Sequence, residues 1–356
     1  MRLPMNDSDV IPTVESNNNT ADDSFGYLFT TLNGHHVTAQ NLVFYLLQVF
    51  VACLVLTLNG LVLDTMVRQG KWREPADLLV AGLALTDALL GVFVLWQTIY
   101  TLVYFQSVWE CLVRLGLAHS MMLTGMLHLV SLTTDRFLKV VTPYRYKDFC
   151  RKWTVWVVMA AIWLLGIVLG SLPVFGWNRS VEAALSGDPV CSYFNIMHEH
   201  FLRFYIVLIQ FCVVVMATLY LKLFLVARKH AVAIAASVPG ESTRQRTSEH
   251  AWRYTKTVLL IVGVNYLSWV PMGMVVIASL TGILGDMSIV KKGDLMLYTS
   301  CLVYGNSIIN PAIYAIKIPA IHARYRALCC RCKKHSSATD GGSRAATTAV
   351  FSLHTM

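Results

Sequence analysis

The sequence predicts an all-α, polytopic membrane protein built as a bundle of seven transmembrane helices. Hydrophobic residues make up 56% of the chain and charged residues only 14%, with a mean hydropathy of +0.55. Soluble domains carry about a quarter charged residues, so this chain has too little polar surface to face water. Residues 153–177 and 295–316 contain no charged side chain. Each run exceeds the about 20 residues with which a helix crosses a bilayer, which excludes one large soluble core.

Seven hydrophobic segments are separated by polar or basic loops. The predicted spans lie at 41–67, 77–104, 110–140, 152–177, 200–228, 254–283 and 294–316. The first forty residues are polar and acidic and lack the apolar region of a removable signal peptide, so the first span should target the chain to the membrane. We expect a seven-helix domain over 41–316, flanked by disordered segments at 1–35 and 335–356.

The distribution of Lys and Arg predicts the orientation. All but six of the 29 Lys and Arg residues fall in the C-terminal tail or in the loops on its side of the membrane. Basic flanks stay in the cytoplasm, so we expect the N terminus outside the plasma membrane and the tail inside. The net charge of +9 then reflects residues beside an anionic lipid leaflet and requires no nucleic-acid partner. Three glycosylation sequons fall on the outer side, at Asn6, Asn18 and Asn178.

The cysteines suggest two modifications. Cys111 at the outer end of the third span and Cys191 in the loop before the fifth face the same oxidising compartment. A disulfide between them would tie this loop over the mouth of the bundle. Cys329 and Cys330 lie among basic residues just past the seventh span, a setting that favours S-palmitoylation, with unmodified cytosolic thiols as the alternative.

Polar side chains inside the spans mark a second candidate site, because an unpaired ionisable group is costly in lipid. Asp87 lies in the middle of the second span. At comparable depth lie Asn59, Asn306, Ser307 and Asn310. Their oxygen atoms could hold a small hydrated cation such as sodium, or a proton. The alternative is an interhelical hydrogen-bond network without an ion. No other metal or cofactor is expected.

A charge pair, Asp135 and Arg136, lies at the cytoplasmic end of the third span. Such a pair can break when a partner protein enters, so it is expected to act as a switch. The alternative is simple anchoring, in which the arginine extends to the membrane interface.

Taken together and in order, these residues resemble the rhodopsin-like family of G-protein-coupled receptors over about residues 41–330. The motifs are Asn59, Leu-Ala-x-x-Asp ending at Asp87, Cys111 with Cys191, Asp135-Arg136-Phe137, Trp163, Tyr220, Trp269-Val270-Pro271 and Asn310-Pro311-Ala312-Ile313-Tyr314. The resemblance implies a receptor rather than an enzyme. It would convert the binding of an extracellular ligand into activation of a heterotrimeric G protein, with arrestin and receptor kinases as further partners.

The resemblance also implies roles by position. Asp87, Asn306 and Ser307 would line a sodium site, although Gly125 replaces a serine common there, and Trp269 would be a rotamer switch beneath the ligand. Residues 317–330 would form a short amphipathic eighth helix. The switch for the G protein would consist of Asp135, Arg136, Tyr220 and Tyr314.

Within this family, segments 171–178 and 220–228 are similar to adenosine receptors. The missing proline of the fifth span resembles the related lipid, cannabinoid and melanocortin receptors. The pattern that contacts adenosine is not met, because Val276 replaces an asparagine, Tyr304 a histidine and Phe194 a glutamate. Without the asparagine, the paired contact with adenine is lost.

Arg114 raises the question of the ligand's charge. Lysophospholipid receptors place an arginine at this position to hold an anionic head group, a task that suits a guanidinium. The alternative is that Arg114 pairs with Glu110. The expected ligand is therefore a lipid with an acidic head group or an adenosine-like small molecule. The candidate pocket residues are Arg114, Ala118, His119, Met122, Tyr193, Phe194, Trp269, Met272 and Tyr304. A transporter or channel, the rival class, would predict internal repeats that the sequence lacks.

Overall fold

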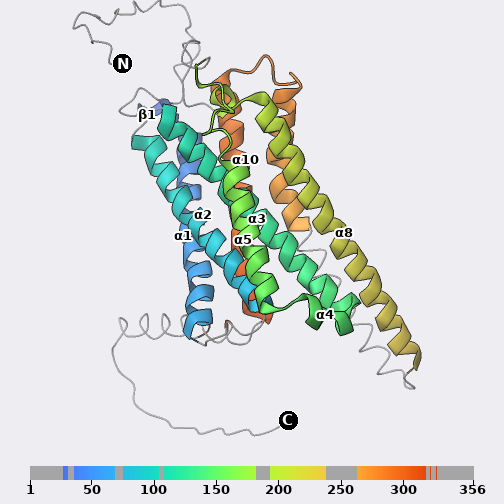
Figure 1. Ribbon diagram of the computed structural model, residues 1–356. Helices are drawn as coiled ribbons and strands as arrows, with labels where there is room; N and C mark the ends of the chain where they lie inside the picture. The colour runs from blue at the N-terminus through green and yellow to red at the C-terminus, as the bar shows by residue number, and fades with distance from the viewer. Residues whose placement is uncertain are drawn as a thin grey trace, which may run out of the picture.

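The computed structural model describes residues 27–30, 36–68, 75–103, 108–181, 193–237 and 263–317, together with residues 321 and 326. Most of these residues belong to long helices that run side by side as a bundle (Figure 1). The long helices are α1 (Ala39–Arg68), α2 (Pro75–Val103), α3 (Val108–Val141), α5 (Lys152–Gly170), α8 (Glu199–Ser237), the helix Gly263–Leu280 and α10 (Ile289–Lys317). This is the all-α bundle expected from the sequence.

Six of the long helices in the described part of the chain are long and apolar enough to cross a membrane. The seventh, α10, has 29 residues and is also long enough, but its polar residues make it less apolar. Asn306, Ser307 and Asn310 of α10 are buried. Because these side chains meet other helices rather than lipid, α10 can cross the membrane with them and complete the set of seven.

Several helix ends differ from the predicted spans. Helix α10 begins at Ile289 instead of 294, and the helix Gly263–Leu280 ends before 283. The predicted span 152–177 is too long, because α5 ends at Gly170 and residues 171–176 form turns. Pro173 has no N–H to donate and disfavours helical backbone at the residue before it. In contrast, α8 continues past residue 228 to Ser237, where alanine-rich sequence favours a helix. Residues 254–262 of the predicted sixth span lie outside the described residues.

A short hairpin precedes α1. Strands β1 (Tyr27–Thr30) and β2 (His36–Thr38) pair antiparallel. Since β1 falls within the segment 1–35 that we expected to be disordered, the structure corrects that expectation for these four residues. Aromatic and β-branched side chains favour strands, and cross-strand pairs stabilise them, but the run is too short to be recognised in the sequence. The rest of 1–35, and all of 335–356, lie outside the described residues.

Helix α3 lies at the centre of the bundle, in contact with α2, α5 and α8. Its residues are buried along most of its length, from Cys111 to Asp135. The largest hydrophobic cluster packs Met122 and Met126 of α3 with Trp269. The predicted eighth helix at 317–330 lies almost wholly outside the described residues, although Ile321 is buried in a cluster with residues of α1 and α2. The buried side chains of α3 are therefore surrounded by other helices.

Two glycines let α5 approach α3 closely. A Cβ added at Gly170 would clash with the backbone of Ser120, and one added at Gly166 would clash with the hydroxyl of Thr124. Small residues of this kind are typical where membrane helices touch. Since interiors are close-packed, an extra carbon at these positions has no space to occupy.

We expect Gly170→Ala to push α5 away from α3 and to lower the free energy of unfolding by about 1–3 kcal/mol. Thermal unfolding of the purified protein in detergent measures this loss. Gly60→Ala in α1 is the matched control, because nothing lies within 4 Å of a Cβ added there. Equal stability of the two variants would show that the contact between α3 and α5 is not tight.

Candidate functional site

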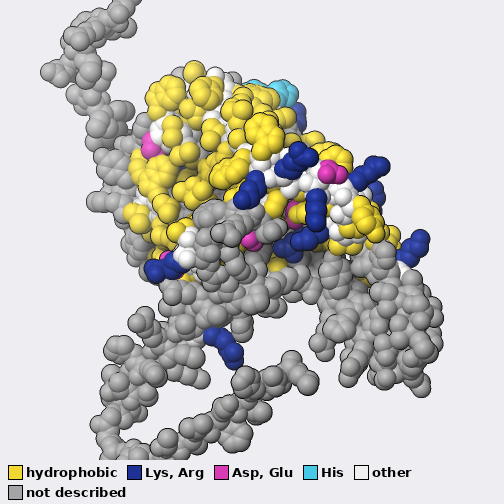
Figure 2. All heavy atoms as spheres, turned by 60° about the horizontal axis from the view of Figure 1, so that its bottom comes forward, with side chains coloured by type: hydrophobic (Ala, Val, Ile, Leu, Met, Phe, Trp, Pro, Cys, Tyr) yellow, Lys and Arg dark blue, Asp and Glu magenta, His cyan; other side chains and the backbone are white. Residues whose placement is uncertain are grey.

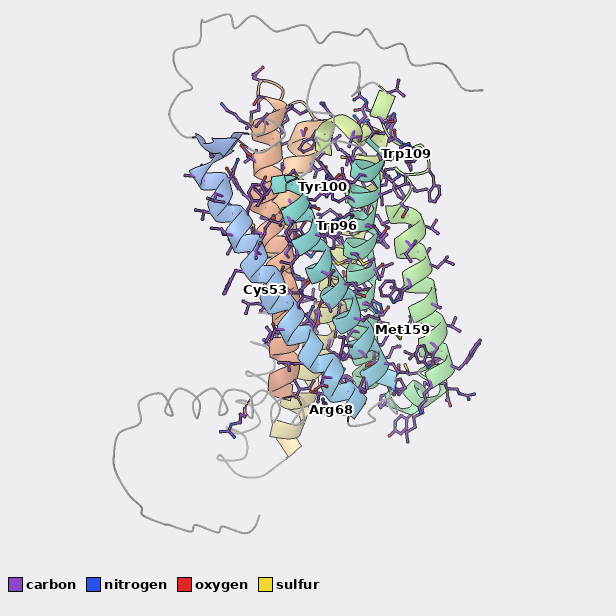
Figure 3. All side chains as sticks on the ribbon, turned by 90° about the vertical axis from the view of Figure 1, so that its left-hand side faces the viewer. Cys53, Arg68, Trp96, Tyr100, Trp109 and Met159 are labelled. Atoms are coloured by element: carbon purple, nitrogen blue, oxygen red, sulfur yellow. The ribbon has the colours of Figure 1, made fainter. Side chains whose placement is uncertain are left out.

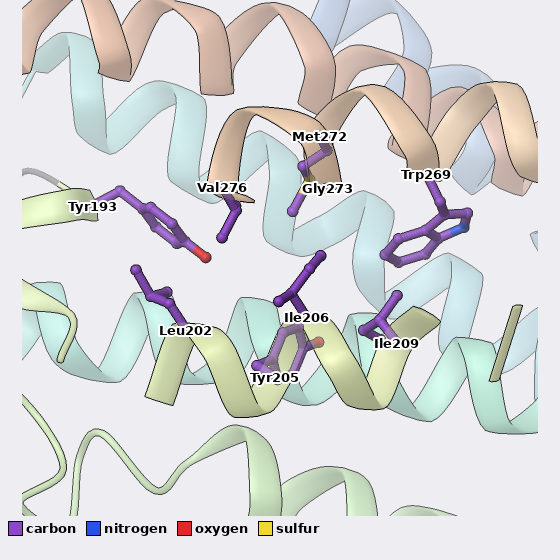
Figure 4. Close-up of a pocket in the computed structure, with 9 residues that line it drawn as sticks. All are labelled: Tyr193, Leu202, Tyr205, Ile206, Ile209, Trp269, Met272, Gly273 and Val276. Atoms are coloured by element: carbon purple, nitrogen blue, oxygen red, sulfur yellow. The ribbon is translucent and has the colours of Figure 1, made fainter. Parts of the chain in front are cut away.

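A small apolar pocket lies between α8 and the helix Gly263–Leu280, beside the short helix α7 (Tyr193–Ile196). Figure 4 shows side chains of the two long helices facing each other across it. None of the lining residues carries a charge. They are Tyr193, Leu202, Tyr205, Ile206, Ile209, Trp269, Met272, Gly273 and Val276.

Both walls of the pocket follow a helical repeat. On α8 the residues stand at i, i+3, i+4 and i+7 from Leu202, and on the facing helix at the same intervals from Trp269. Each helix thus presents one face to the pocket. Of the candidates taken from the sequence, Tyr193, Trp269 and Met272 line this pocket. The α8 wall was missed, although the repeat that starts at Leu202 is a signal from which it could have been found.

His119 lies behind the pocket and positions two of its tyrosines. Its Nδ1 is 2.7 Å from the carbonyl oxygen of Leu115, and its Nε2 is 3.2 Å from the hydroxyl of Tyr193. The hydroxyl of Tyr205 donates to the backbone carbonyl of His119 over 2.8 Å. The imidazole stacks on the Tyr193 ring and meets Phe201 and Tyr205 edge to face. His119 therefore supports the pocket without lining it.

Arg114 is 3% exposed and does not line the pocket. Its Nε lies 2.8 Å from a carboxylate oxygen of Glu110, and its guanidinium carbon lies 5.4 Å from the centre of the Tyr100 ring. Tyr100 is near one end of α2 (Figure 3). This geometry is the alternative in which Arg114 pairs with Glu110. An anionic head group would have to displace the Glu110 carboxylate from an ion pair whose arginine is buried and whose glutamate is partly exposed.

The remaining pocket candidates are packing residues. Met122 belongs to the hydrophobic cluster that contains Trp269, and the Phe194 ring meets Tyr193 edge to face. Ala118 and Tyr304 lie in a different buried cluster, formed by α1, α2, α3 and α10. Of the residues expected around one ligand, Ala118 and Tyr304 thus pack in a different hydrophobic cluster from Met122 and Trp269.

The polar residues of the second candidate site do come together. Both carboxylate oxygens of Asp87 accept hydrogen bonds from α10, one from the Ser307 hydroxyl over 2.7 Å and one from the Asn310 amide over 3.1 Å. The Asn59 amide donates to the backbone carbonyl of Ser307 over 3.1 Å. All four residues are buried. This network joins α1, α2 and α10 in the middle of the bundle.

Asn306 turns away from Asp87. Its amide nitrogen lies 3.4 Å from the side-chain oxygen of Asn265, so it connects α10 with the helix Gly263–Leu280 instead. The side-chain oxygen of Asn59 is buried and has no hydrogen-bond donor in the described part of the chain. A carboxylate, a hydroxyl and a spare amide oxygen are the ligand types that hard cations prefer.

The inner end of α3 differs from expectation. The Asp135 carboxylate accepts a hydrogen bond of 2.7 Å from the hydroxyl of Tyr146 in the short helix α4 (Pro143–Phe149). Within the described part of the chain the Asp135 carboxylate bonds to Tyr146 rather than to Arg136, and the role of Asp135 and Arg136 as a switch stays a prediction. Adjacent residues of a helix point in different directions and do not face each other.

The Asp135 carboxylate also acts on a nearby cysteine. Burial and the negative charge of Asp135 raise the pKa of the Cys150 thiol.

The other residues of the expected inner switch are only partly described. Tyr220 is buried beside Leu223 and packs against Phe137 and Ile313. The Tyr314 side chain lies outside the described residues. A contact between Tyr220 and Tyr314 therefore stays a prediction.

Cys111 is bonded in a disulfide, while the other described cysteines are free. Its expected partner Cys191 lies outside the described residues, so the pairing stays a prediction. The same is true of glycans on Asn6 and Asn18 and of lipids on Cys329 and Cys330.

Asn178, the third sequon, is described and is already engaged. Its amide donates to the carbonyl of Pro173 over 2.8 Å, and its side-chain oxygen accepts from the N–H of Ser180 over 3.0 Å. A glycan bonds to this same amide nitrogen, so the turn that follows α5 competes with glycosylation of Asn178.

The fold and the site define a polytopic helical membrane protein with a pocket, a buried polar network and an inner hydrogen-bonded acid. A family model described as 7 transmembrane receptor (rhodopsin family) matches residues 58–314. Since the match covers most of the chain, the chain belongs to the rhodopsin family of seven-transmembrane receptors. It is therefore a G-protein-coupled receptor and not an enzyme, and a transporter is not favoured.

The chain is also similar to curated adenosine receptors. It is 22% identical to adenosine receptor A3 of Bos taurus over 307 residues, which cover 83% of this chain and 92% of that receptor. It is 26% identical to adenosine receptor A2b of Bos taurus over 294 residues, which cover 78% and 87%. The resemblance to the adenosine receptor group is thereby confirmed.

We expect Tyr146→Phe to destabilise the inner end of the receptor by about 1–3 kcal/mol, because the buried Asp135 carboxylate loses a donor. Thermal unfolding of purified receptor measures the change. Tyr144→Phe in the same helix is the matched control, because Tyr144 is 95% exposed. If both variants unfold at the wild-type temperature, the hydrogen bond to Asp135 contributes nothing to stability.

Proposed function

We propose that this receptor binds a small, uncharged and largely apolar extracellular ligand in the pocket above Trp269. The observation that carries the proposal is the pocket itself, whose two walls come from different long helices and contain no charged residue. Apolar walls with a few polar atoms are the usual lining of a small-molecule site. In this arrangement of the helices the cavity is about 10 Å³, room for roughly one water molecule, so a larger ligand requires α8 and the helix Gly263–Leu280 to move apart.

The position of Arg114 supports a neutral ligand over a lipid with an acidic head group. The guanidinium is buried against Glu110 and Tyr100 and lies outside the lining of the pocket. A ligand in the pocket therefore finds no cation with which to pair. To pair with a ligand, the guanidinium of Arg114 would have to leave the Glu110 carboxylate with which it is already paired.

The relatives named adenosine receptors support a ligand of nucleoside size, since adenosine is a small uncharged molecule. The walls differ from the adenosine pattern, because Val276 lines the pocket where those receptors have an asparagine. A valine cannot replace the paired hydrogen bonds of an amide, and a site that lacks them loses selectivity for adenine. We therefore infer a ligand that is more apolar than adenosine.

The arrangement of charges supports a plasma-membrane orientation with the pocket outside. Lys and Arg side chains gather on the end of the bundle that carries α4 (Figure 2). Arg68 lies toward that end and Trp109 toward the opposite one (Figure 3). Basic residues mark the cytoplasmic side, and exposed tryptophans such as Trp109, which is 66% exposed, mark the interface.

A change in the contacts of the ligand would be transmitted to the inner end of the bundle through Trp269 and the two helices that form the pocket walls. Trp269 lines the pocket and also packs in the cluster with Met122 and Met126 of α3. A ligand that binds one arrangement of these helices better than another shifts their populations, and the G protein reads the shift at the inner end. Arrestin and receptor kinases would act on the same inner face and on Ser and Thr residues of the tail.

A substitution that fills the pocket tests whether the ligand binds there. In cells, second-messenger responses to a panel of neutral nucleosides and apolar small molecules would identify an agonist. We expect Val276→Phe to abolish or strongly weaken its potency at equal surface level, because the ring occupies the ligand's space. Ile277→Phe is the matched control, because Ile277 is 46% exposed on the outer face of the same helix. Equal loss in both variants, or an agonist that is acidic, contradicts the proposal.

We also propose that Asp87, Ser307 and Asn59 hold a sodium ion that favours the inactive arrangement. The spare oxygen of Asn59 beside the Asp87 network supports this proposal, whereas the two hydrogen bonds already made by Asp87 support a network without an ion. Gly125 supplies no ligand, yet a Cβ added there has only Thr86 nearby, at 3.7 Å. The space would accept a serine.

Gly125→Ser should therefore increase the effect of sodium on agonist affinity, since its hydroxyl adds a fourth protein oxygen. Gly125→Ala is the matched control that adds the same Cβ without oxygen. The measurement is agonist binding in membranes with sodium and with a larger organic cation at equal ionic strength. If sodium does not change agonist binding to the wild type and has no larger effect in Gly125→Ser, the site is a hydrogen-bond network without an ion.

A further inference from the structure

Both tyrosines that line the pocket have their hydroxyl protons directed at His119. Tyr193 and Tyr205 supply the only side-chain oxygen atoms among the lining residues. Their hydroxyls lie 3.2 Å from His119 Nε2 and 2.8 Å from its carbonyl oxygen. The direction of each proton decides what a ligand meets on this wall.

The Leu115 carbonyl fixes the direction of the first proton. A carbonyl oxygen only accepts, so the His119 Nδ1, 2.7 Å away, must carry the proton. In a neutral imidazole the other nitrogen then has a lone pair. The Tyr193 hydroxyl therefore donates to His119 Nε2 and keeps only lone pairs for other partners.

The surroundings of His119 keep the imidazole neutral. It is 3% exposed, and its ring contacts in the described part of the chain are Tyr193, Phe201 and Tyr205, none of which is charged. A buried imidazolium without a carboxylate would be costly. Burial also raises the pKa of Tyr193, so the phenol keeps the proton that it donates.

The second proton has only one possible direction. The acceptor of Tyr205 is a backbone carbonyl, so the phenol must be the donor. Figure 4 shows the hydroxyl of Tyr193 directed into the pocket between Val276 and Leu202. The lining donor, Trp269 Nε1, is buried, and its nitrogen is on the side of the indole away from Tyr193. The tyrosine wall thus offers acceptors only.

We propose that the pocket selects a ligand with a hydroxyl or N–H group directed at Tyr193 and Tyr205, and that it rejects carboxylates and phosphates at that position. The inference rests on the proposed neutral-ligand pocket and adds the polarity of its hydrogen bonds. A donor satisfies the phenol lone pairs, whereas an anion places its own lone pairs against them in an apolar enclosure. This repulsion is the element that gives specificity.

Three probes with one aromatic body test the polarity: 2-naphthol, which has a donor; 2-methoxynaphthalene, which has only an acceptor; and 2-naphthoate, an anion. Binding is measured as the concentration-dependent rise in unfolding temperature of the receptor in lipid nanodiscs. The signal of Val276→Phe, the filled pocket, is subtracted to remove partitioning into lipid. We expect 2-naphthol to bind roughly 3- to 10-fold tighter than 2-methoxynaphthalene, with 2-naphthoate weakest.

Two variants distinguish the contribution of the Tyr193 hydroxyl oxygen from that of the hydroxyl proton. Tyr193→Phe removes both, so the preference for 2-naphthol over 2-methoxynaphthalene should shrink. His119→Phe keeps the Tyr193 oxygen and frees its proton, so 2-methoxynaphthalene should gain affinity relative to 2-naphthol. A merely structural role of His119 would weaken all three probes alike. If His119→Phe fails to fold, the wild-type order of the probes together with Tyr193→Phe still tests the inference.

Each outcome is decisive. Tighter binding of 2-naphthoate or 2-methoxynaphthalene than of 2-naphthol overturns the acceptor wall and leaves the pocket in place. Binding of all three that is the same in wild type and Val276→Phe overturns the pocket and, with it, both proposals. The expected order with an unchanged preference in Tyr193→Phe also overturns the inference, because the donor would then be recognised elsewhere.

Discussion

The close contact between α3 and α5 fixes the position of the groups on which function depends. Gly166 and Gly170 bring the α5 backbone against Ser120 and Thr124 of α3. Helix α3 also contacts α2 and α8, so many of its side chains between Cys111 and Asp135 are buried. His119 can then reach the tyrosines of the pocket at one level, and Asp135 can reach α4 at another.

A bilayer offers no water to buried polar groups, so the charged side chains inside the bundle bond to partners within the protein. At the outer level, Arg114 pairs with Glu110. At mid-depth, Asp87 is held by two side chains of α10. At the inner end, Asp135 is held by a tyrosine of α4. The last two join different helices, so any relative movement of those helices changes a hydrogen bond. This sensitivity suits a receptor, which must have two arrangements of similar energy.

The relation to adenosine receptors illustrates how members of one family can share a fold while the residues that line the pocket differ. The similarity covers 83% of this chain at 22% identity in one relative and 78% at 26% in another. The pocket walls consist mainly of aliphatic and aromatic side chains, and Val276 is among them. Fold and signalling thus follow from family membership, while the ligand follows from the walls.

The sequence by itself determined the class of protein, because long uncharged runs and ordered motifs depend only on the order of residues along the chain. It also placed Asn59, Asn306, Ser307 and Asn310 at the depth of Asp87. Only the structure showed that Ser307 and Asn310 bond to the Asp87 carboxylate whereas Asn306 bonds to Asn265. Contacts between side chains of different helices depend on how each helix is rotated, which a linear pattern does not encode. For that reason only the tertiary structure decided that Arg114 pairs with Glu110 outside the lining of the pocket. It also decided that the hydroxyls of Tyr193 and Tyr205, which line the pocket, form hydrogen bonds with His119.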